Sequence, residues 1–438
     1  MLVLDQHGGQ CDQGIRSVGD SFLSCVEIWI MRIGMVLQHP YPPDIRVEKE
    51  ARILRAAGHK VHLLSYRSSR KEEPTEETLE GLILRRVASE RLHLKTVERW
   101  LNSLRYFLDF QNRYWDVQMS RFVRDFEIEA LHVHDLPPLG TALSVAQRAG
   151  IPIISDLHEN YPASLELRDM IQPGSRSRLN PSPRRWFAYE NRALRRASKI
   201  IVVVEEAKER LIKEHGLPED RISVVMNVED VDHFENIKIE TDILSRYQDF
   251  FTMVYVGGGG KHRGLETAIK AMGYLRDSMP DLKLVLIGPG GSEAEDLQAL
   301  ADKEGVRERV ELIGWQPFSK IPTYISASRI GLVPHLQNPH TDTTIPHKIF
   351  QYMLMSKPVV VSSCQPLKRI VEETGCGLAF QANDPQDLAK RIQELYVNPQ
   401  LQVDCGRHGR EAVLKRYNWV IEGQKLCFLY HSLSKGNS

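Results

Sequence analysis

The hydrophobic positions of the chain alternate between short β-branched runs and longer segments with helical spacing. This alternation begins near residue 32 and is typical of parallel sheets with helices on both faces. The seven predicted strands of a first series are Ile33–Gln38, Lys60–Tyr66, Leu82–Val87, Ala130–Val133, Ile151–Ser155, Lys199–Val204 and Ile222–Met226, and the six of a second series are Thr252–Val256, Leu282–Ile287, Val310–Ile313, Ile330–Val333, Pro358–Val361 and Leu378–Phe380.

The two series are separated by residues 228–250, which are acidic and lack hydrophobic periodicity, as expected of a linker. We therefore expect an α/β protein with two doubly wound domains, at residues 32–227 and 251–405. The helical stretch 406–438 has no strand after it and is expected to cross back to the first domain. Residues 1–31 mix glycine with polar residues and predict a disordered extension.

The overall composition excludes several classes of protein. Its 57 Lys and Arg balance 57 Asp and Glu, which argues against a protein that coats nucleic acid. No stretch of 18 apolar residues occurs, so no membrane-spanning helix is expected. The six cysteines lack metal-binding spacing and predict free thiols in a reducing compartment, in keeping with a cytoplasmic protein.

In the first domain, acidic residues and histidines directly follow two predicted strands. His134-Asp135 follows one strand and His158-Glu159 the next, and ligands of open α/β sheets bind beyond these carboxyl ends. A carboxylate there suits a general base, and a histidine suits the positioning of a ligand and the stabilisation of charge. A structural hydrogen bond is the alternative for each histidine. We favour a catalytic role for His158 and keep His134, Asp135 and Glu159 as further candidates.

In the second domain, glycines and cations follow the strands instead. Gly257–Gly260 would let the backbone approach a ligand closely, and the next helix would favour an anion at its N-terminus. Thr343 and Thr344 are predicted to cap a second helix, which Pro346 enters. A tight turn and an ordinary capped helix remain the alternatives. The predicted phosphate-binding residues are Gly257, Gly258, Gly259, Gly260, Lys261, Arg263, Thr344, Ile345, Lys348 and Arg46.

No cofactor is expected. The chain lacks a P-loop lysine motif, which disfavours a phosphoryl-transferring ATPase. Asp230 and Asp232 are spaced like a metal-binding carboxylate pair, but they lie in the expected linker. We therefore predict that cationic side chains and a helix dipole, not a metal ion, neutralise a bound diphosphate.

Several segments resemble one known family. The run from Ile345 to Val360 resembles the signature helix and strand of retaining GT-B glycosyltransferases of family 4. Val256–Gly264 is similar to the donor-phosphate loop of that family, and Asn227–Phe234 to its interdomain segment. The resemblance extends from about residue 32 to about residue 420. It implies two Rossmann-like domains that face each other across a cleft, with a nucleotide-diphospho-sugar donor in the C-terminal domain and an acceptor in the N-terminal domain.

The resemblance also implies roles for individual residues. Arg263 matches the phosphate-binding lysine of the family, Lys348 lies in the loop that contacts the diphosphate, and His158 matches the histidine that faces the donor sugar. The residues expected at the nucleotide and ribose are Gly288, Gly290, Trp315 and Gln351, and those expected at the donor sugar are Thr343 and His347.

The sequence departs from the family in three places. Thr343 and Gln351 replace the two glutamates of the Glu-x7-Glu motif, Gly258 takes the usual position of an arginine, and Asp44-Ile45-Arg46 stands where the family has a Gly-Gly pair in the first loop. An amide still hydrogen-bonds a ribose diol, whereas a threonine cannot supply the charge of a carboxylate. We expect Arg46, at a predicted helix start, to supply the missing cation.

Two stretches of the first domain are basic and aromatic. Residues 85–124 hold nine Lys and Arg against four acids, and residues 161–200 hold nine against three. Such helices suit an anionic membrane surface that carries a lipid-linked acceptor, although ordinary helices with their aromatic side chains in the core would have the same composition.

The predicted function is transfer of a sugar from a nucleotide-diphosphate donor to a glycan or polyprenyl-diphosphate-linked acceptor, with retention, in cell-surface polysaccharide synthesis. The protein is expected at the inner face of the membrane, without a nucleic-acid partner. Two alternatives remain, namely a GT-B nucleotide-sugar epimerase and a non-catalytic module that binds nucleotide sugars.

Overall fold

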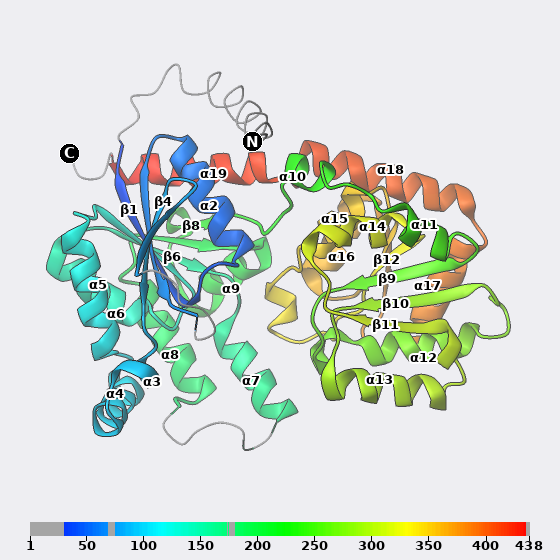
Figure 1. Cartoon of the computed structure of the whole chain (residues 1–438), viewed down its shortest axis with the longest axis horizontal. Coiled ribbons are helices and arrows are strands. Elements are labelled where there is room, and N and C mark those ends of the chain that lie inside the picture. Colours follow the sequence, from blue (N-terminus) through cyan, green and yellow to red (C-terminus); the bar gives the residue numbers. More distant parts are fainter. Residues whose placement is uncertain (1–29, 69–74, 173, 175–179, 435–438) are drawn as a thin grey trace, which may run out of the picture. The chain divides into compact units, whose positions relative to one another are not determined.

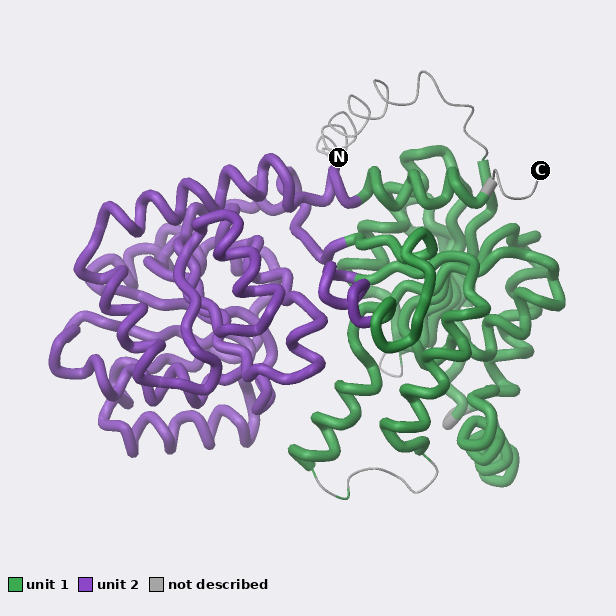
Figure 2. Tube along the Cα trace, turned by 180° about the vertical axis from the view of Figure 1, so that it is seen from behind, with its two compact units in different colours: residues 1–202, 211–225, 423–438 green, residues 203–210, 226–422 purple. Residues whose placement is uncertain are grey.

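The computed structural model describes residues 30–68, 75–172, 174 and 180–434. These residues form two compact units (Figure 2). Unit 1 comprises residues 1–202, 211–225 and 423–438, and unit 2 comprises residues 203–210 and 226–422. The prediction for residues 1–31 lies outside the described residues, except for residues 30 and 31.

Unit 1 is built on a sheet of eight strands in the order β3-β4-β2-β1-β5-β6-β7-β8, parallel except for the antiparallel edge strand β3 (Figure 1). The strands are β1 (Arg32–Pro40), β2 (Lys60–Tyr66), β3 (Glu76–Leu79), β4 (Leu82–Val87), β5 (Ala130–His134), β6 (Ile153–Leu157), β7 (Lys199–Val202) and β8 (Ile222–Val224). The central strands are buried along their whole length, as expected of a parallel sheet that is covered on both faces.

The helices of unit 1 begin at well-defined caps. Asp44 accepts hydrogen bonds from two backbone N–H groups at the start of α2, and Asn112 and Asn160 cap α5 and α7 in the same way. The helices are α2 (Ile45–Ala56), α3 (Glu90–His93), α4 (Thr96–Asp109), α5 (Arg113–Asp125), α6 (Leu139–Ala149), α7 (Tyr161–Ile171) and α8 (Pro183–Leu194). The helices α9 (Glu205–His215) and α19 (Trp419–Ser434) each have residues in both units.

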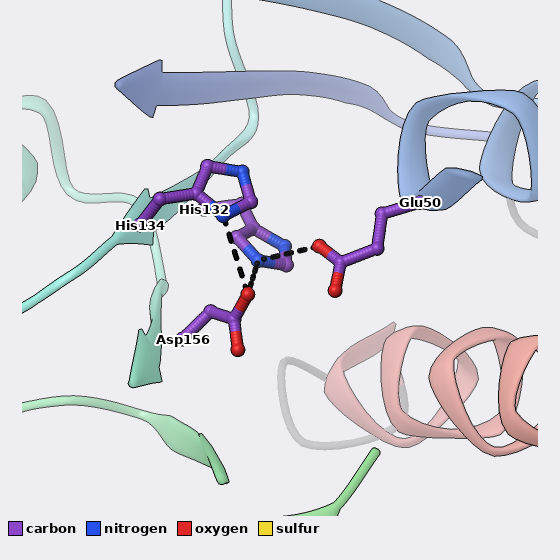
Figure 3. A group of neighbouring side chains, drawn as sticks. All are labelled: Glu50, His132, His134 and Asp156. Carbon is purple, nitrogen blue, oxygen red and sulfur yellow. Dashed lines mark hydrogen bonds and ion pairs between the residues drawn. The ribbon is translucent and has the colours of Figure 1, made fainter. Parts of the chain in front are cut away.

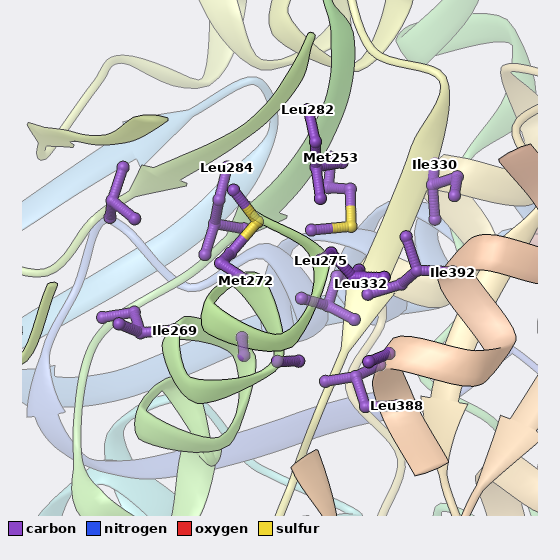
Figure 4. Close-up of a cluster of buried hydrophobic side chains, with 14 of the residues drawn as sticks. Met253, Ile269, Met272, Leu275, Leu282, Leu284, Ile330, Leu332, Leu388 and Ile392 are labelled. Carbon is purple, nitrogen blue, oxygen red and sulfur yellow. The ribbon is translucent and has the colours of Figure 1, made fainter. Parts of the chain in front are cut away.

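Unit 2 has a six-stranded parallel sheet in the order β11-β10-β9-β12-β13-β14. Its strands are β9 (Phe251–Val256), β10 (Leu282–Ile287), β11 (Val310–Gly314), β12 (Ile330–Val333), β13 (Val359–Ser362) and β14 (Gly377–Phe380). Its helices are α10 (Val231–Glu235), α11 (Thr241–Tyr247), α12 (Leu265–Leu275), α13 (Gly291–Lys303), α14 (Ile321–Ser326), α15 (Lys348–Leu354), α16 (Gln365–Thr374), α17 (Pro385–Tyr396) and α18 (Pro399–Lys415). Figure 4 shows the core between this sheet and the helices α12 and α17, where Met272, Leu284 and Ile392 are buried.

All thirteen predicted strands are present, with ends that differ by at most two residues. The pattern missed β3, since its sequence Glu-Glu-Thr-Leu is too polar and too short to stand out. The segment 228–250, expected to lack structure, contains the short helices α10 and α11. Within the described residues, no helix is both long and apolar enough to cross a membrane.

Candidate functional site

A group of buried polar side chains lies at the carboxyl ends of β1, β5 and β6 in unit 1. It consists of the buried residues Arg46, Glu50, His132, His134 and Asp156 and the partly exposed His158, and we call it the polar centre of unit 1. Figure 3 shows four of them, Glu50, His132, His134 and Asp156. The pairing of β5 with β6 sets His134 opposite Asp156. Because side chains two apart on a strand point to one face, His132 and His134 reach the centre together.

Asp156 is the hub of the polar centre. It accepts hydrogen bonds from the Nε and Nη2 atoms of Arg46 at 3.1 and 2.8 Å. Its Oδ2 atom also lies 2.8 Å from Nε2 of His158 and 3.2 Å from Nδ1 of His134. Burial would raise the pKa of Asp156, but Arg46 and the histidines hold it well below its usual range. The Asp156 carboxylate is therefore a fixed anion that orients two imidazole rings.

His158 lies between two carboxylates. Its Nε2 atom faces Asp156, and its Nδ1 atom lies 3.6 Å from Oδ1 of Asp135. Burial alone would lower the pKa of His158, but Asp135 and Asp156 raise it to about 9. At neutral pH His158 is therefore an imidazolium, which supplies a positive charge but cannot accept a further proton as a general base.

The other three predicted candidates differ in character. Burial lowers the pKa of His134 to about 3, so this ring is neutral and lies in contact with His158 at 3.2 Å. Burial and the charge of Asp135 raise the pKa of Glu159. The geometry thus brings His134, Asp135 and His158 together, and Glu159 lies within the electrostatic reach of Asp135.

A second layer behind Asp156 was not anticipated. Glu50 is buried beside Arg46 at 3.0 Å and lies 3.4 Å from Nε2 of His132. Burial, together with the charge of Asp156, raises the pKa of Glu50 to about 7. On the other side, Nδ1 of His132 lies 2.8 Å from the hydroxyl of Tyr430. The spacing His132-x-His134 on one strand is the sequence signal that would have indicated His132, whereas no local pattern indicates Glu50 or Tyr430.

Four of these residues place possible metal-ligand atoms as close together as in a metal site. One ligand atom each from Glu50, His132, His134 and Asp156 lies within 4.8 Å of the others. The guanidinium of Arg46, however, already contacts both carboxylates and supplies the positive charge that a metal ion would bring. The residues therefore fit an ion-paired network better than a metal centre.

Arg46 was predicted to bind the donor phosphate, and its geometry gives it other partners. It is only 5% exposed, and its guanidinium contacts Asp156, Glu50 and the carbonyl oxygen of Val225. These partners neutralise its charge and use its donors. The arrangement therefore does not support a role for Arg46 at a phosphate.

The glycine loop after β9 in unit 2 leaves space for a lysine. A Cβ atom on Gly257 would lie 2.7 Å from Nζ of Lys348, so a side chain there would displace the lysine. Nζ of Lys348 lies over the ring of Tyr255 at 3.7 Å, and the Tyr255 hydroxyl donates to the carbonyl of Gly258. Gly257 and Tyr255 thus hold the buried amino group of Lys348 directly beside the loop.

Two basic side chains lie at this loop, and neither is paired with a carboxylate of the described residues. We call Arg263 and Lys348 the cation cluster of unit 2, and His262 and His335 lie beside it as neutral rings, because burial and these cations lower the pKa of both. Within the described residues, neither Arg263 nor Lys348 forms an ion pair with a carboxylate, and the buried Nε of Arg263 has no hydrogen-bond partner. Burial, followed by repulsion from Arg263, holds the pKa of Lys348 well below its usual range. Burial and the same cations lower the pKa of His262 to about 4. Such a cluster is preorganised for an anion.

The loop before α15 is arranged differently from the prediction. Thr343 and Thr344 do not cap the helix, because their hydroxyls donate back to the carbonyls of Pro339 and His340. His347 is the N-cap residue and makes no side-chain cap hydrogen bond. Lys348 still projects from the first turn to the glycine loop, so the lysine approaches the loop without the predicted cap.

The amide of Gln351 is buried and donates to Oε2 of Glu229 at 2.7 Å. Glu229 is also buried, and sequence reasoning missed it because it lies in the segment expected to be a linker. Asp230 caps α10 by accepting from the N–H of His233, which gives its carboxylate a structural role. Gln351 therefore has a protein carboxylate as a partner, and its ribose-binding role stays a prediction.

Three of the predicted nucleotide and ribose residues, Gly288, Gly290 and Trp315, follow the ends of β10 and β11. The N–H of Gly288 donates to the carbonyl of Gly314 at 2.8 Å, which brings the two strand ends together. Trp315 follows Gly314 and is 79% exposed, so it is not a core residue. An exposed indole at this edge is available for stacking, and its contact with a base stays a prediction.

One carboxylate lies against the glycine loop. Glu293, near the start of α13, accepts a hydrogen bond from the N–H of Gly260, and a Cβ atom on Gly259 would collide with it. Because this carboxylate lies where the loop would hold the predicted diphosphate, Glu293→Gln should tighten the binding of inorganic diphosphate by about twofold to tenfold, the effect of removing roughly 1 kcal/mol of repulsion. Calorimetric titration with inorganic diphosphate measures the change. Glu295→Gln, an exposed position on the same helix, is the matched control, and equal affinities for wild type and Glu293→Gln would contradict the expectation.

Two family models match the chain. The model described as Glycosyltransferase Family 4 matches residues 45–233, and the model described as Glycosyl transferases group 1 matches residues 236–412. Alpha-D-kanosaminyltransferase of Streptomyces kanamyceticus is 21% identical over 289 residues, which make up 65% of this chain and 71% of that protein.

Solved structures are similar over nearly the whole chain. Sucrose-phosphate synthase from Thermosynechococcus elongatus has a TM-score of 0.75 at 18% identity and covers 93% of this chain and 100% of its own. Anabaena Alr3699/HepE in complex with UDP-glucose has a TM-score of 0.68 at 16% identity and covers 92% of this chain and 100% of its own. At these identities the likeness shows a common fold of two parallel-sheet domains.

Proposed function

Because the chain belongs to family 4 of the glycosyltransferases and has the GT-B fold, we propose that it transfers a sugar from a nucleoside-diphosphate-sugar donor to a glycan or lipid-linked acceptor, with retention. The observation that carries this proposal is the cation cluster of unit 2. Arg263 and Lys348 are held beside a glycine loop without a carboxylate partner among the described residues, and a diphosphate would supply the missing charge.

In the proposed reaction, the bond between the anomeric carbon and the diphosphate oxygen breaks, and a bond from that carbon to an acceptor oxygen forms. The acceptor proton passes to the leaving phosphate. Lys348 and Arg263 stabilise the charge that develops on the diphosphate, so no metal ion is required there. We assign to the imidazolium of His158, in unit 1, a further fixed positive charge that positions the reacting sugar.

We place the acceptor on unit 1 and assign the protein to the synthesis of cell-surface polysaccharide, with a polyprenyl-diphosphate-linked glycan as the preferred acceptor. The basic and aromatic residues of this unit support an acceptor that carries phosphate at a membrane. The side-chain amide of Gln351 donates to the carboxylate of Glu229. This contact supports a ribose-binding role for the pair, which would take the place of the two glutamates of the family motif.

A thermal-shift screen with UDP-, GDP- and TDP-sugars tests the proposal. A donor at 100 times its dissociation constant should stabilise the protein by about 2.7 kcal/mol, and non-cognate donors should stabilise it less. The selected donor is then incubated with candidate acceptors, and the products are analysed by mass spectrometry and by the anomeric configuration. Epimerised free donor would establish the epimerase instead, and binding without turnover on any acceptor would establish a binding module.

A further inference from the structure

The helix α4 exposes its apolar face. Val97, Trp100, Leu101, Leu104 and Leu108 follow helical spacing and form one stripe, which we call the apolar stripe of α4. Val97, Trp100, Leu101 and Leu108 are between 53% and 68% exposed, and Leu104 is half-buried. A helix packed on a globular core normally shows the opposite arrangement, so this stripe requires a partner outside the described part of the chain.

The inward face of α4 is polar, which fixes the orientation of the helix. Asn102 is only 6% exposed and donates to Glu90 at 2.8 Å and to Asn112 at 3.0 Å. One turn later, the Tyr106 hydroxyl donates to the carbonyl of Pro137 at 3.1 Å. Turning the apolar stripe inward would break these buried hydrogen bonds, so the exposure of the stripe is built into the fold.

Cations lie beside the apolar stripe. The guanidinium of Arg185, in the first turn of α8, lies 4.4 Å from the ring of Phe107 and donates to the carbonyl of Leu108 at 3.1 Å. These contacts place the start of α8 beside the end of α4, and Figure 1 shows both at one end of unit 1. Lys95, at the start of α4, and Arg184 form no ion pair within the described residues. The stripe is therefore bordered by free positive charge.

The charge of the wider stretch 85–124 is smaller than its composition suggests. Arg85, Arg86 and Arg124 form ion pairs with Glu76, Glu77 and Asp125, acids that lie outside that stretch. These three arginines are therefore neutralised. Within the described residues, the basic side chains without an ion pair that border the apolar stripe include Lys95 and, from the second basic stretch, Arg184. Of the surfaces formed by the two basic stretches, the one at α4 and the start of α8 is therefore the candidate.

We propose that α4 lies flat on an anionic bilayer, with its apolar stripe at the boundary of the acyl chains and with Lys95, Arg184 and Arg185 on the lipid headgroups. An exposed tryptophan between aliphatic side chains is suited to this boundary. The inference rests on the proposed function only in the choice of a lipid-linked acceptor. Membrane binding itself needs neither donor nor acceptor.

Co-sedimentation of the full chain with vesicles tests the proposal. The protein should bind vesicles of phosphatidylcholine and phosphatidylglycerol, bind phosphatidylcholine alone more weakly, and dissociate as salt is raised. The double variant Leu101→Asp/Leu108→Asp should bind the anionic vesicles at least about tenfold more weakly than wild type. The matched control is Val397→Asp/Val403→Asp, which changes two exposed aliphatic residues of unit 2 and should bind like wild type.

Two further measurements make the outcomes decisive. The thermal shift with UDP should be the same for the Leu101→Asp/Leu108→Asp variant and wild type, which shows that the variant is folded and that donor binding is separate. Brominated lipids should quench wild-type fluorescence but have a smaller effect on Trp100→Phe. No binding to anionic vesicles, or equal binding by both double variants, would overturn the proposal. A dimer in sedimentation velocity that the Leu101→Asp/Leu108→Asp variant loses would assign the stripe to a second copy instead.

Discussion

Replacing Lys348 by methionine should remove UDP binding while making the ligand-free protein more stable. Nζ of Lys348 lies beside Gly257 and Arg263 without a carboxylate partner among the described residues. Loss of a buried charge that pairs with a diphosphate costs about 2–5 kcal/mol, which corresponds to roughly thirtyfold to several thousandfold in dissociation constant. In the free protein the same charge is uncompensated, so its removal relieves a cost of burial. Calorimetry with UDP and thermal unfolding without ligand measure the two effects.

The pH dependence of stability gives Lys348→Met a further signature. Because the folded pKa of Lys348 lies below 10.5, the unfolded chain binds the proton more strongly than the folded protein does. The free-energy cost of burying the charged Lys348 side chain is complete below the folded pKa and disappears as pH rises towards 10.5. The stability of wild type should therefore rise with pH in this window. Lys348→Met should lose the part of that rise that Lys348 causes. Lys357→Met is the control: burial lowers the pKa of Lys357 to about 8 and its Nζ donates to the carbonyl of Ser326, so this variant should lose only its own part of the rise and keep the UDP affinity of wild type. Unchanged UDP affinity in Lys348→Met would refute the phosphate assignment.

Replacing His158 by glutamine should lower kcat by about 100-fold to 1,000-fold, the usual effect of removing one preorganised charged donor. Affinity for UDP should stay within about threefold of wild type, because the residues assigned to the diphosphate belong to unit 2. A glutamine keeps a donor towards Asp156 and avoids an unpaired carboxylate in the polar centre. Steady-state kinetics and calorimetry with UDP measure the two quantities, and a normal kcat would show that His158 has only a structural role.

The charge of His158 predicts how activity depends on pH. The imidazolium is lost as pH rises through about 9, so kcat should fall on that alkaline side. Since its folded pKa lies above 6.5, the stability gained from its carboxylate neighbours is complete below pH 6.5 and is lost as pH rises through about 9. Asp135→Asn removes one of the two carboxylates that raise this pKa, and should move the fall in kcat to lower pH. A profile identical to that of wild type would contradict the role of this charge.

The alternating pattern of the sequence predicted the fold well. Buried parallel strands need continuous β-branched runs, and each such run can be recognised from its own residues alone. It missed β3 because that strand is short and polar, and stands at an edge that the pattern does not mark. It also missed α10 and α11, since their short helical turns carry too few residues for a period to be visible.

The sequence predicted those residues of the candidate site that directly follow the end of a strand. His134, Asp135 and His158 meet because neighbouring parallel strands end at one edge, and the glycine loop with Lys348 and Arg263 follows the same rule in unit 2. The residues that control their charge were not predicted. Glu50 and Tyr430 come from helices far away in sequence, and no local pattern indicates that they reach the polar centre.

The sequence by itself therefore determined the order of strands and helices, the two parallel sheets and the loops that carry the chemistry, since all of these depend on local patterns. Only the tertiary structure decided which charges are paired. It neutralised Arg46 with Asp156, left Lys348 uncompensated and turned the apolar stripe of α4 outward. The physical reason is that burial and ion pairing depend on neighbours in space, and electrostatic energies change severalfold with the distance and burial of those neighbours.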